Sequence, residues 1–129
     1  KLNLTTGTWT TVDAAVKAGH SAAMYLPGKI LKTGTAADSG TSGNAAATAY
    51  VIDMNQPAPA WRQVASMAHP RAFHNTTLLP DGSVLVTGGG TTLDGLNLSK
   101  AVLAAELWSP ATETWRTLVK TLQDRTVRR

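Results

Sequence analysis

The sequence predicts an all-β fold made of two similar four-stranded units, and three observations support this prediction. Residues 20–34 align without a gap with residues 74–88, so the chain repeats with a period of 54 residues. The same offset aligns Trp61 with Trp115, across a loop whose sequence differs between the copies. Short runs of Leu and Val alternate with turn residues, and only 16% of the 129 residues are charged, as is typical of strands joined by many turns.

The first two strands of each copy are predicted on either side of a tight turn. The first strand runs from about His20 to Leu26, and a Pro-Gly turn leads into a strand through Ile30 and Leu31. In the second copy a Pro-Asp-Gly turn stands at the same place, before a strand through residues 84–86 that ends at glycine. Each copy therefore begins with a hairpin.

The third and fourth strands follow a loop rich in Gly, Ser, Thr and Asn, at 35–44 in one copy and 89–99 in the other. The third strand covers about 47–54 or 101–108, and the fourth includes Trp61 to Val64 or Trp115 to Leu118. Ala, Leu and Glu at 101–108 also favour a helix. The equivalent Tyr50, Val51 and Ile52 prefer strands, so a strand is favoured in both copies.

The net charge of +4 resides mainly in the last ten residues, where four basic residues and one acidic residue lie between Lys120 and Arg129. A nucleic-acid site needs a basic patch on folded structure interleaved with aromatic residues, and no aromatic residue follows Trp115. No run approaches the roughly 18 apolar residues that span a bilayer. The sequence therefore predicts neither a nucleic-acid partner nor a membrane partner.

Two motifs resemble a known family. Gly88-Gly89, followed by Trp108 and Trp115, resembles the kelch repeat. More specifically, the stretch Arg71-Ala72-Phe73-His74-Asn75-Thr76-Thr77-Leu78-Leu79-Pro80-Asp81-Gly82-Ser83-Val84-Leu85-Val86-Thr87-Gly88-Gly89 resembles the β-propeller of the galactose oxidase and glyoxal oxidase family. The earlier Gly28-Lys29-Ile30-Leu31 is similar to that family's preceding blade, and the resemblance covers roughly residues 18–119.

The resemblance implies that residues 1–129 are part of a β-propeller. Residues 8–12 would be the outer strand of a preceding blade, 18–65 the first blade and 72–119 the second blade. Residues 120–129 would be a basic tail or the start of the next blade. The expected partner is the remainder of the propeller or another copy of the chain, because blades bury their faces against neighbours.

The resemblance also implies a chemistry for the parent protein. Family members use one copper ion and a tyrosyl radical to oxidise a primary alcohol or aldehyde, and dioxygen is reduced to hydrogen peroxide. Their ligands are two tyrosines and two histidines, one tyrosine being linked to a cysteine, and this sequence has no cysteine. The family's Arg-x-Tyr-His ligand motif would begin at Arg129 if a short insertion is allowed, or would be replaced at 125–128 in strict register. We therefore expect no catalytic residue and no metal ligand in this chain, copper in the parent, and an extracellular location.

Phe73, Arg71 and His74 are the candidate substrate-binding residues, because in the family this stretch reaches toward the substrate mouth and Phe73 is similar to a pocket-wall residue. The structural alternative is that Arg71 and His74 hydrogen-bond the backbone of a neighbouring blade, as repeated polar positions commonly do. His20 is the equivalent of His74 in the first copy, and its spacing to His69 and His74 does not specify a metal site.

The alternative function is a non-catalytic kelch propeller that binds protein or carbohydrate. Trp61, Trp108 and Trp115 form a candidate sugar-stacking platform, although aromatic residues at fixed positions of a repeat are more often packed between blades. A third hypothesis is a structural piece that has no activity alone. The candidate small ligands are therefore a carbohydrate or a small alcohol or aldehyde.

Overall fold

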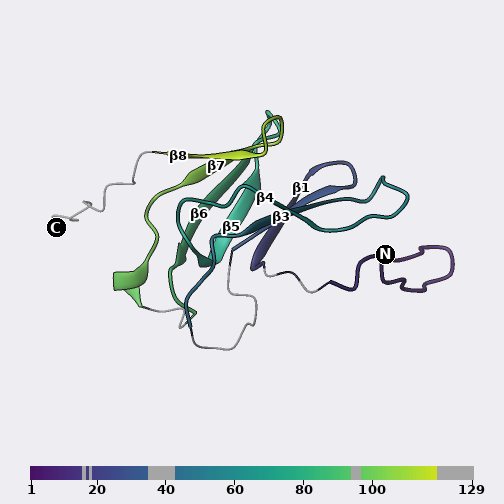
Figure 1. Cartoon of the computed structure of the whole chain (residues 1–129), viewed down its shortest axis with the longest axis horizontal. Coiled ribbons are helices and arrows are strands. Elements are labelled where there is room, and N and C mark those ends of the chain that lie inside the picture. The colour runs from purple at the N-terminus through teal and green to yellow at the C-terminus, as the bar shows by residue number, and fades with distance from the viewer. Residues whose placement is uncertain (16, 18, 35–42, 94–96, 119–129) are drawn as a thin grey trace, which may run out of the picture.

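The strands of the computed structural model form two four-stranded antiparallel sheets, each with its strands in sequence order (Figure 1). The structure describes residues 1–15, 17, 19–34, 43–93 and 97–118. Sheet 1 consists of β1 (Ser21–Leu26), β2 (Lys29–Thr33), β3 (Ala49–Asp53) and β4 (Arg62–Val64). Sheet 2 consists of β5 (Ala72–Leu78), β6 (Val84–Gly90), β7 (Glu106–Ser109) and β8 (Thr114–Thr117), with the 3-10 helix η1 (Leu98–Lys100) between β6 and β7. The predicted all-β class is confirmed.

The first hairpin of each sheet turns at a glycine, as the repeat predicts. Gly28 and Gly82 adopt φ values of 74° and 83°, a left-handed conformation that costs glycine little. In the second hairpin Asp81 Oδ1 accepts a hydrogen bond of 2.9 Å from the Ser83 backbone, and Leu79 N donates to Ser83 O at 2.8 Å. The turn residues therefore place β6 in register with β5.

The third strands are shorter than predicted, most of all in sheet 2. The predicted strand at 101–108 begins only at Glu106, and β6 pairs with β7 no further than Val86 opposite Glu106. Beyond this point Gly88 and Gly89 adopt φ values of 72° and 81°, which interrupts the pleat of β6. Residues 101–105 form an isolated bridge at Ala101 and no helix, so the helical alternative for 101–108 is wrong.

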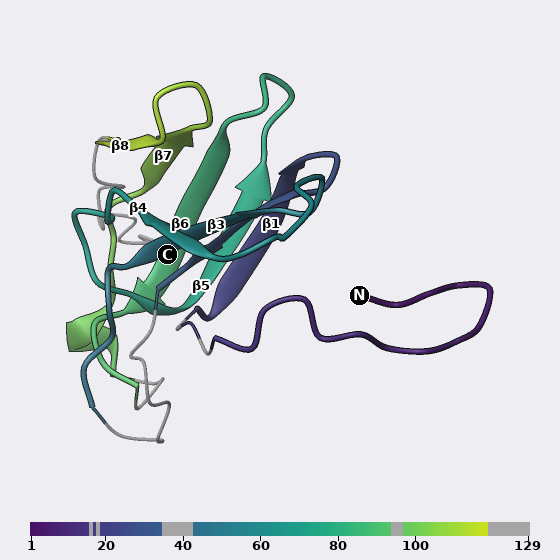
Figure 2. The same ribbon diagram turned by 45° about the vertical axis from the view of Figure 1, so that its right-hand side comes forward.

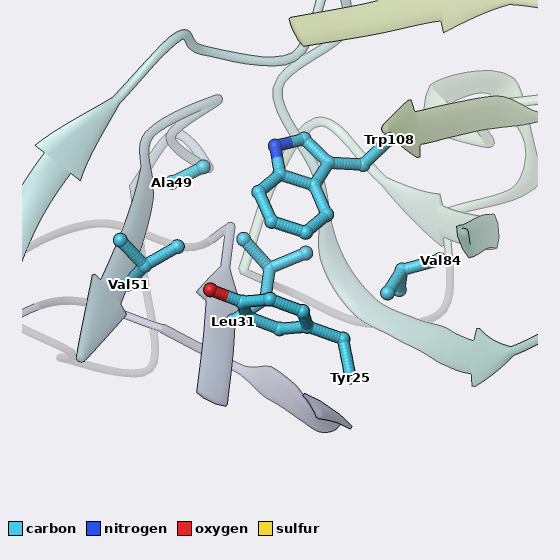
Figure 3. Close-up of a cluster of buried hydrophobic side chains, with 6 residues drawn as sticks. All are labelled: Tyr25, Leu31, Ala49, Val51, Val84 and Trp108. Atoms are coloured by element: carbon cyan, nitrogen blue, oxygen red, sulfur yellow. The ribbon is translucent and has the colours of Figure 1, made fainter. Parts of the chain in front are cut away.

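The two sheets bury a common apolar core between their facing sides. Its members come from both sheets: Tyr25, Leu31, Ala49, Val51, Val84 and Trp108 (Figure 3). The Tyr25 ring meets the Trp108 ring edge to face, with centroids 4.8 Å apart. Trp108 is fully buried and Trp115 packs against the same core, so the packing role predicted for these two tryptophans is confirmed.

Polar contacts also join the sheets where β1 and β5 lie side by side (Figure 2). The Ser21 and Thr76 hydroxyls are 2.8 Å apart. Trp115 Nε1 donates a hydrogen bond of 2.8 Å to the carbonyl of Ala65, which follows β4. Together with the core, these contacts place the end of β2 beside the start of β5.

The N-terminal segment forms a small hairpin of its own that projects away from both sheets (Figure 1 and Figure 2). Leu2 and Trp9 form an isolated bridge, and Asn3 N donates to Thr8 O at 2.9 Å. Within the described residues, 8–12 pair with neither sheet, and their assignment to a preceding blade stays a prediction. Residues 120–129 lie outside the described part of the chain. No helix among the described residues is long and apolar enough to cross a membrane.

Candidate functional site

The three predicted site residues lie where the chain enters β5, at the end of sheet 2 opposite the 80–83 turn. Cross-strand pairing sets His74 opposite Gly88 and Ala72 opposite Gly90. On the other side, His74 lies against Thr33 at the end of β2. Although close in sequence, Arg71, Phe73 and His74 have very different surroundings.

Arg71 is fully buried and its guanidinium is bonded within sheet 2. Nη2 donates to Glu106 Oε2 at 2.6 Å and to Ala104 O at 2.8 Å, and Nη1 donates to Gly88 O at 3.0 Å. Its partners therefore belong to its own sheet rather than to the neighbouring one. These contacts tie the start of β5 to β6 and β7.

Glu106 is the second half of this buried site, and it was not among the predicted residues. Its carboxylate also accepts hydrogen bonds from the backbone of Ala68 at 2.6 Å and of His69 at 3.3 Å, in the connection between the sheets. A signal exists in the sequence: Glu106 lies two residues before Trp108, so both side chains point to the same face of β7. An acid on the buried face of a strand needs a basic partner.

His74 is 4% exposed and bridges the two sheets through its side chain. Its Nε2 lies 2.8 Å from Thr33 Oγ1. Burial, together with the smaller effects of the nearby Arg71 and His20, lowers the pKa of His74 from 6.5 to about 4. The ring is therefore neutral at neutral pH, and its role in this structure is to join β5 to β2.

Phe73 alone of the three is exposed, with 49% of its surface accessible. Its φ is 57°, a left-handed conformation that costs a bulky residue of order 1–3 kcal/mol and persists only where neighbours impose it. The buried and bonded Arg71 and His74 supply that constraint on either side. The Phe73 ring meets the exposed His20 edge to face, with centroids 4.7 Å apart and an angle of 71°. We call these two rings the aromatic corner.

The described residues do not fit a copper site. No group of three or more His, Cys, Asp or Glu side chains gathers among them. The centroids of His20 and His74 are 6.2 Å apart, but His74 Nε2 is engaged with Thr33. The predicted substrate-binding role of Phe73, Arg71 and His74 stays a prediction.

A separate hollow of about 380 Å³ lies at the other end of the sheets, near the hairpin turns. Trp61, Lys29, Asp53, Arg62 and Glu113 are among the side chains that line it. Arg62 and Glu113 form a two-pronged ion pair across the sheets, with Nη1 and Oε2 2.7 Å apart, and Lys29 Nζ lies 3.6 Å from Asp53 Oδ2. Trp61, the third predicted platform residue, therefore borders a hollow that Trp108 and Trp115 do not line.

Comparison with solved structures identifies the architecture. The chain is similar to a fungal alcohol oxidase of the AA5 family, solved in complex with copper, with a TM-score of 0.70 and 26% identity over 78% of this chain and 21% of that chain. It is also similar to YjhT, with a TM-score of 0.62 and 16% identity over 84% of this chain and 30% of that chain, a likeness that shows the fold alone. The fold is of the β-propeller type. The likeness to the oxidase supports a coarse resemblance to copper-containing alcohol oxidases.

Comparison of sequences covers less of the chain. No protein-family model matches it. A stretch of 56 residues, 42% of this chain, is 43% identical to Adagio-like protein 3 of Oryza sativa subsp. japonica, of which it covers 9%. The chain thus spans a small part of each protein that it resembles.

Proposed function

We propose that this chain supplies two blades of a larger, extracellular β-propeller enzyme that oxidises a primary alcohol or aldehyde at a copper centre. In the alcohol reaction two electrons and two protons leave the substrate carbinol, and dioxygen accepts them to become hydrogen peroxide. The copper ligands belong to other parts of the enzyme. The observation that carries the proposal is the exposed, left-handed Phe73, on a fold similar to that of a copper-bound alcohol oxidase.

The contribution of this chain is a wall of the substrate mouth. Phe73 is the wall residue, and the buried contacts of Arg71 and His74 hold it in its unfavourable backbone conformation. Strained residues cluster at binding and active sites because the surrounding structure can fix a side chain where a ligand meets it. Arg71 and His74 thus act on the substrate through Phe73.

The remaining blades are the proposed partner of this chain. On the face of sheet 1 that points away from the core, Met24 and Ile30 stand in one cross-strand row with Ile52. Met24 is 56% exposed and Ile30 is half-buried. An apolar sheet face of this kind is stabilised when another blade, or another copy of the chain, packs on it.

The test uses the protein that contains this chain, first characterised by intact mass and peptide mapping. Peroxide production is measured with and without copper for the wild type, for Phe73→Ala and for Leu78→Ala. Leu78 is a matched control because it lies in the same strand, is 47% exposed and is at the opposite end of β5. We expect Phe73→Ala to lower kcat/KM about tenfold, equivalent to about 1.4 kcal/mol of lost transition-state stabilisation, and Leu78→Ala to change it less than twofold.

Two outcomes would contradict the proposal. Absence of copper-dependent peroxide formation from any primary alcohol or aldehyde would remove the enzymatic function. Equal effects of Phe73→Ala and Leu78→Ala would leave an oxidase in which this chain does not form the substrate mouth.

A non-catalytic, carbohydrate-binding propeller is the second candidate function, and the hollow beside Trp61 favours it. Its lining combines an indole ring with paired acidic and basic side chains, which offer both donors and acceptors to hydroxyl groups. Calorimetric titration with oligosaccharides separates the two functions. Binding that Trp61→Ala abolishes, in a protein that forms no peroxide, would establish this second function.

A further inference from the structure

We infer that the aromatic corner of His20 and Phe73 selects an alcohol or aldehyde with an aromatic body over a polyhydroxylated sugar. The inference rests on the proposed function, because it names the substrate class of the same mouth. It follows from which groups a ligand can reach, which polar groups are already bonded, and how the two exposed rings are oriented.

The surface that a ligand can reach at this place is mainly aromatic. Phe73 is 49% exposed and His20 is exposed, whereas Arg71 is 0% and His74 is 4% exposed. The sequence motif presents two basic side chains beside Phe73, but the fold turns both into the interior. Of the three polar side chains Arg71, His74 and His20, only that of His20 is exposed.

The buried polar groups are also mostly bonded, and the two of their atoms that lack a partner, Arg71 Nε and His74 Nδ1, are enclosed by the protein. Arg71 donates to Gly88 O, Ala104 O and Glu106, and His74 Nε2 is paired with Thr33. A sugar ring brings several hydroxyl groups, and each one that loses water without gaining a partner weakens binding. A benzylic alcohol brings a single hydroxyl group, which one imidazole can bond as donor or acceptor.

The geometry of the two rings suits an aromatic ligand. Their planes are 71° apart with centroids separated by 4.7 Å, so their exposed faces meet at a steep angle. A third ring can lie on one face and present its edge to the other, an arrangement that stabilises aromatic pairs beyond the effect of the buried area. The constrained backbone of Phe73 fixes where its side chain leaves the chain, and contact with the His20 ring restricts the Phe73 ring, which reduces the entropy lost when a ligand binds.

The kinetic test compares benzyl alcohol with galactose in the full protein. We expect wild type to prefer benzyl alcohol by at least about tenfold in kcat/KM, a difference of about 1.4 kcal/mol. His20→Phe keeps an aromatic ring but loses the proposed hydrogen bond between the imidazole and the substrate hydroxyl. His20→Ala loses both the ring and this hydrogen bond. His20→Ala should therefore reduce the preference about fivefold, His20→Phe should reduce it less, and Leu78→Ala should leave it unchanged.

A protein that oxidises galactose as well as benzyl alcohol would overturn the inference, as would a preference that His20→Ala and Leu78→Ala change equally.

A binding readout separates failure of this inference from failure of the proposed function. Saturation-transfer difference NMR without turnover should show transfer to the benzyl alcohol ring, its loss in Phe73→Ala and its retention in Leu78→Ala. Galactose at the same concentration should show no transfer that depends on Phe73. If this pattern appears in a protein that oxidises no alcohol, the corner's selectivity stands and the oxidase function fails. If galactose shows the same dependence on Phe73, or benzyl alcohol shows none, the selectivity is overturned whether or not the protein is an oxidase.

Discussion

At the scale of single residues, Glu106 of β7 and Glu113 of the turn before β8 show how burial determines what a charge contributes to stability. Glu106 and its partner Arg71 are both fully buried, whereas Arg62 and Glu113 keep side-chain exposures of 59% and 30%. Burying a charge is costly, so a buried ion pair that loses one partner leaves an uncompensated charge inside the protein. An exposed pair that loses one partner is resolvated by water.

The first prediction compares Glu106→Gln with Glu113→Gln, two substitutions of identical chemistry. Glu106→Gln leaves the Arg71 guanidinium buried without its counter-charge, and we expect a loss of about 3–5 kcal/mol in the free energy of unfolding. Glu113→Gln should cost less than about 1 kcal/mol. Chemical denaturation of both variants measures the difference, and equal losses would show that Arg71 does not depend on the charge of Glu106.

At the scale of elements, the hairpins are determined by local turn chemistry. Gly28 and Gly82 occupy equivalent positions of the repeat and share a left-handed conformation. A Cβ added at Gly28 would lie 2.8 Å from the Asn55 side chain, whereas at Gly82 it would meet no atom within 4 Å. A substitution at Gly82 therefore tests the cost of the left-handed backbone conformation without an added steric clash.

The second prediction concerns this β5–β6 turn. Gly82→Ala forces a residue with a Cβ into the left-handed region and should lower the free energy of unfolding by about 1–2 kcal/mol. Gly82→Asn should cost less, because asparagine tolerates that region. Thermal or chemical denaturation gives the ranking, and an alanine variant as stable as wild type would mean that the turn can adopt another conformation.

At the scale of the whole molecule, stability depends on how the two sheets meet. The shared core joins them through apolar contacts, and the His74 to Thr33 hydrogen bond lies buried between the same two sheets. In the folded protein the pKa of His74 is lowered to about 4. The unfolded chain therefore binds a proton in a pH range where the folded protein does not.

The third prediction is a pH dependence of unfolding that His74 causes. Between about pH 6.5 and pH 4 the unfolded state holds more protons, so stability falls as the pH is lowered through this window, by up to about 1.4 kcal/mol per pH unit. Above pH 6.5 the contribution is constant. Denaturation of wild type and His74→Gln across this range should give a shallower slope for the variant, while Asn75→Gln, which changes no titrating group at an exposed position of the same strand, keeps the wild-type slope. Parallel curves for wild type and His74→Gln would contradict the lowered pKa of His74.

The sequence alone determined the repeating architecture of this protein. The 54-residue register, the turn glycines and the strand-forming residues act over a few neighbours, so two four-stranded units, their hairpins and the core position of Trp108 could be predicted from them. The same signals overestimated the strand at 101–108, because the left-handed Gly88 and Gly89 interrupt the regular ladder of β6, beyond which only an isolated bridge joins Ala101 to Gly90 among the described residues. Pairing of a third strand depends on the backbone of its neighbour rather than on its own composition.

Only the tertiary structure decided which of the candidate site residues a ligand can reach. Arg71 and His74 are buried because Glu106 and Thr33, 35 and 41 residues away, come to them from other strands. Phe73 is exposed between them because those two contacts fix the backbone on both sides of it. Propensity and spacing report contacts between near neighbours in the chain, whereas burial is a property of the assembled sheets, so the aromatic corner became visible only when β2, β5 and β7 were brought together.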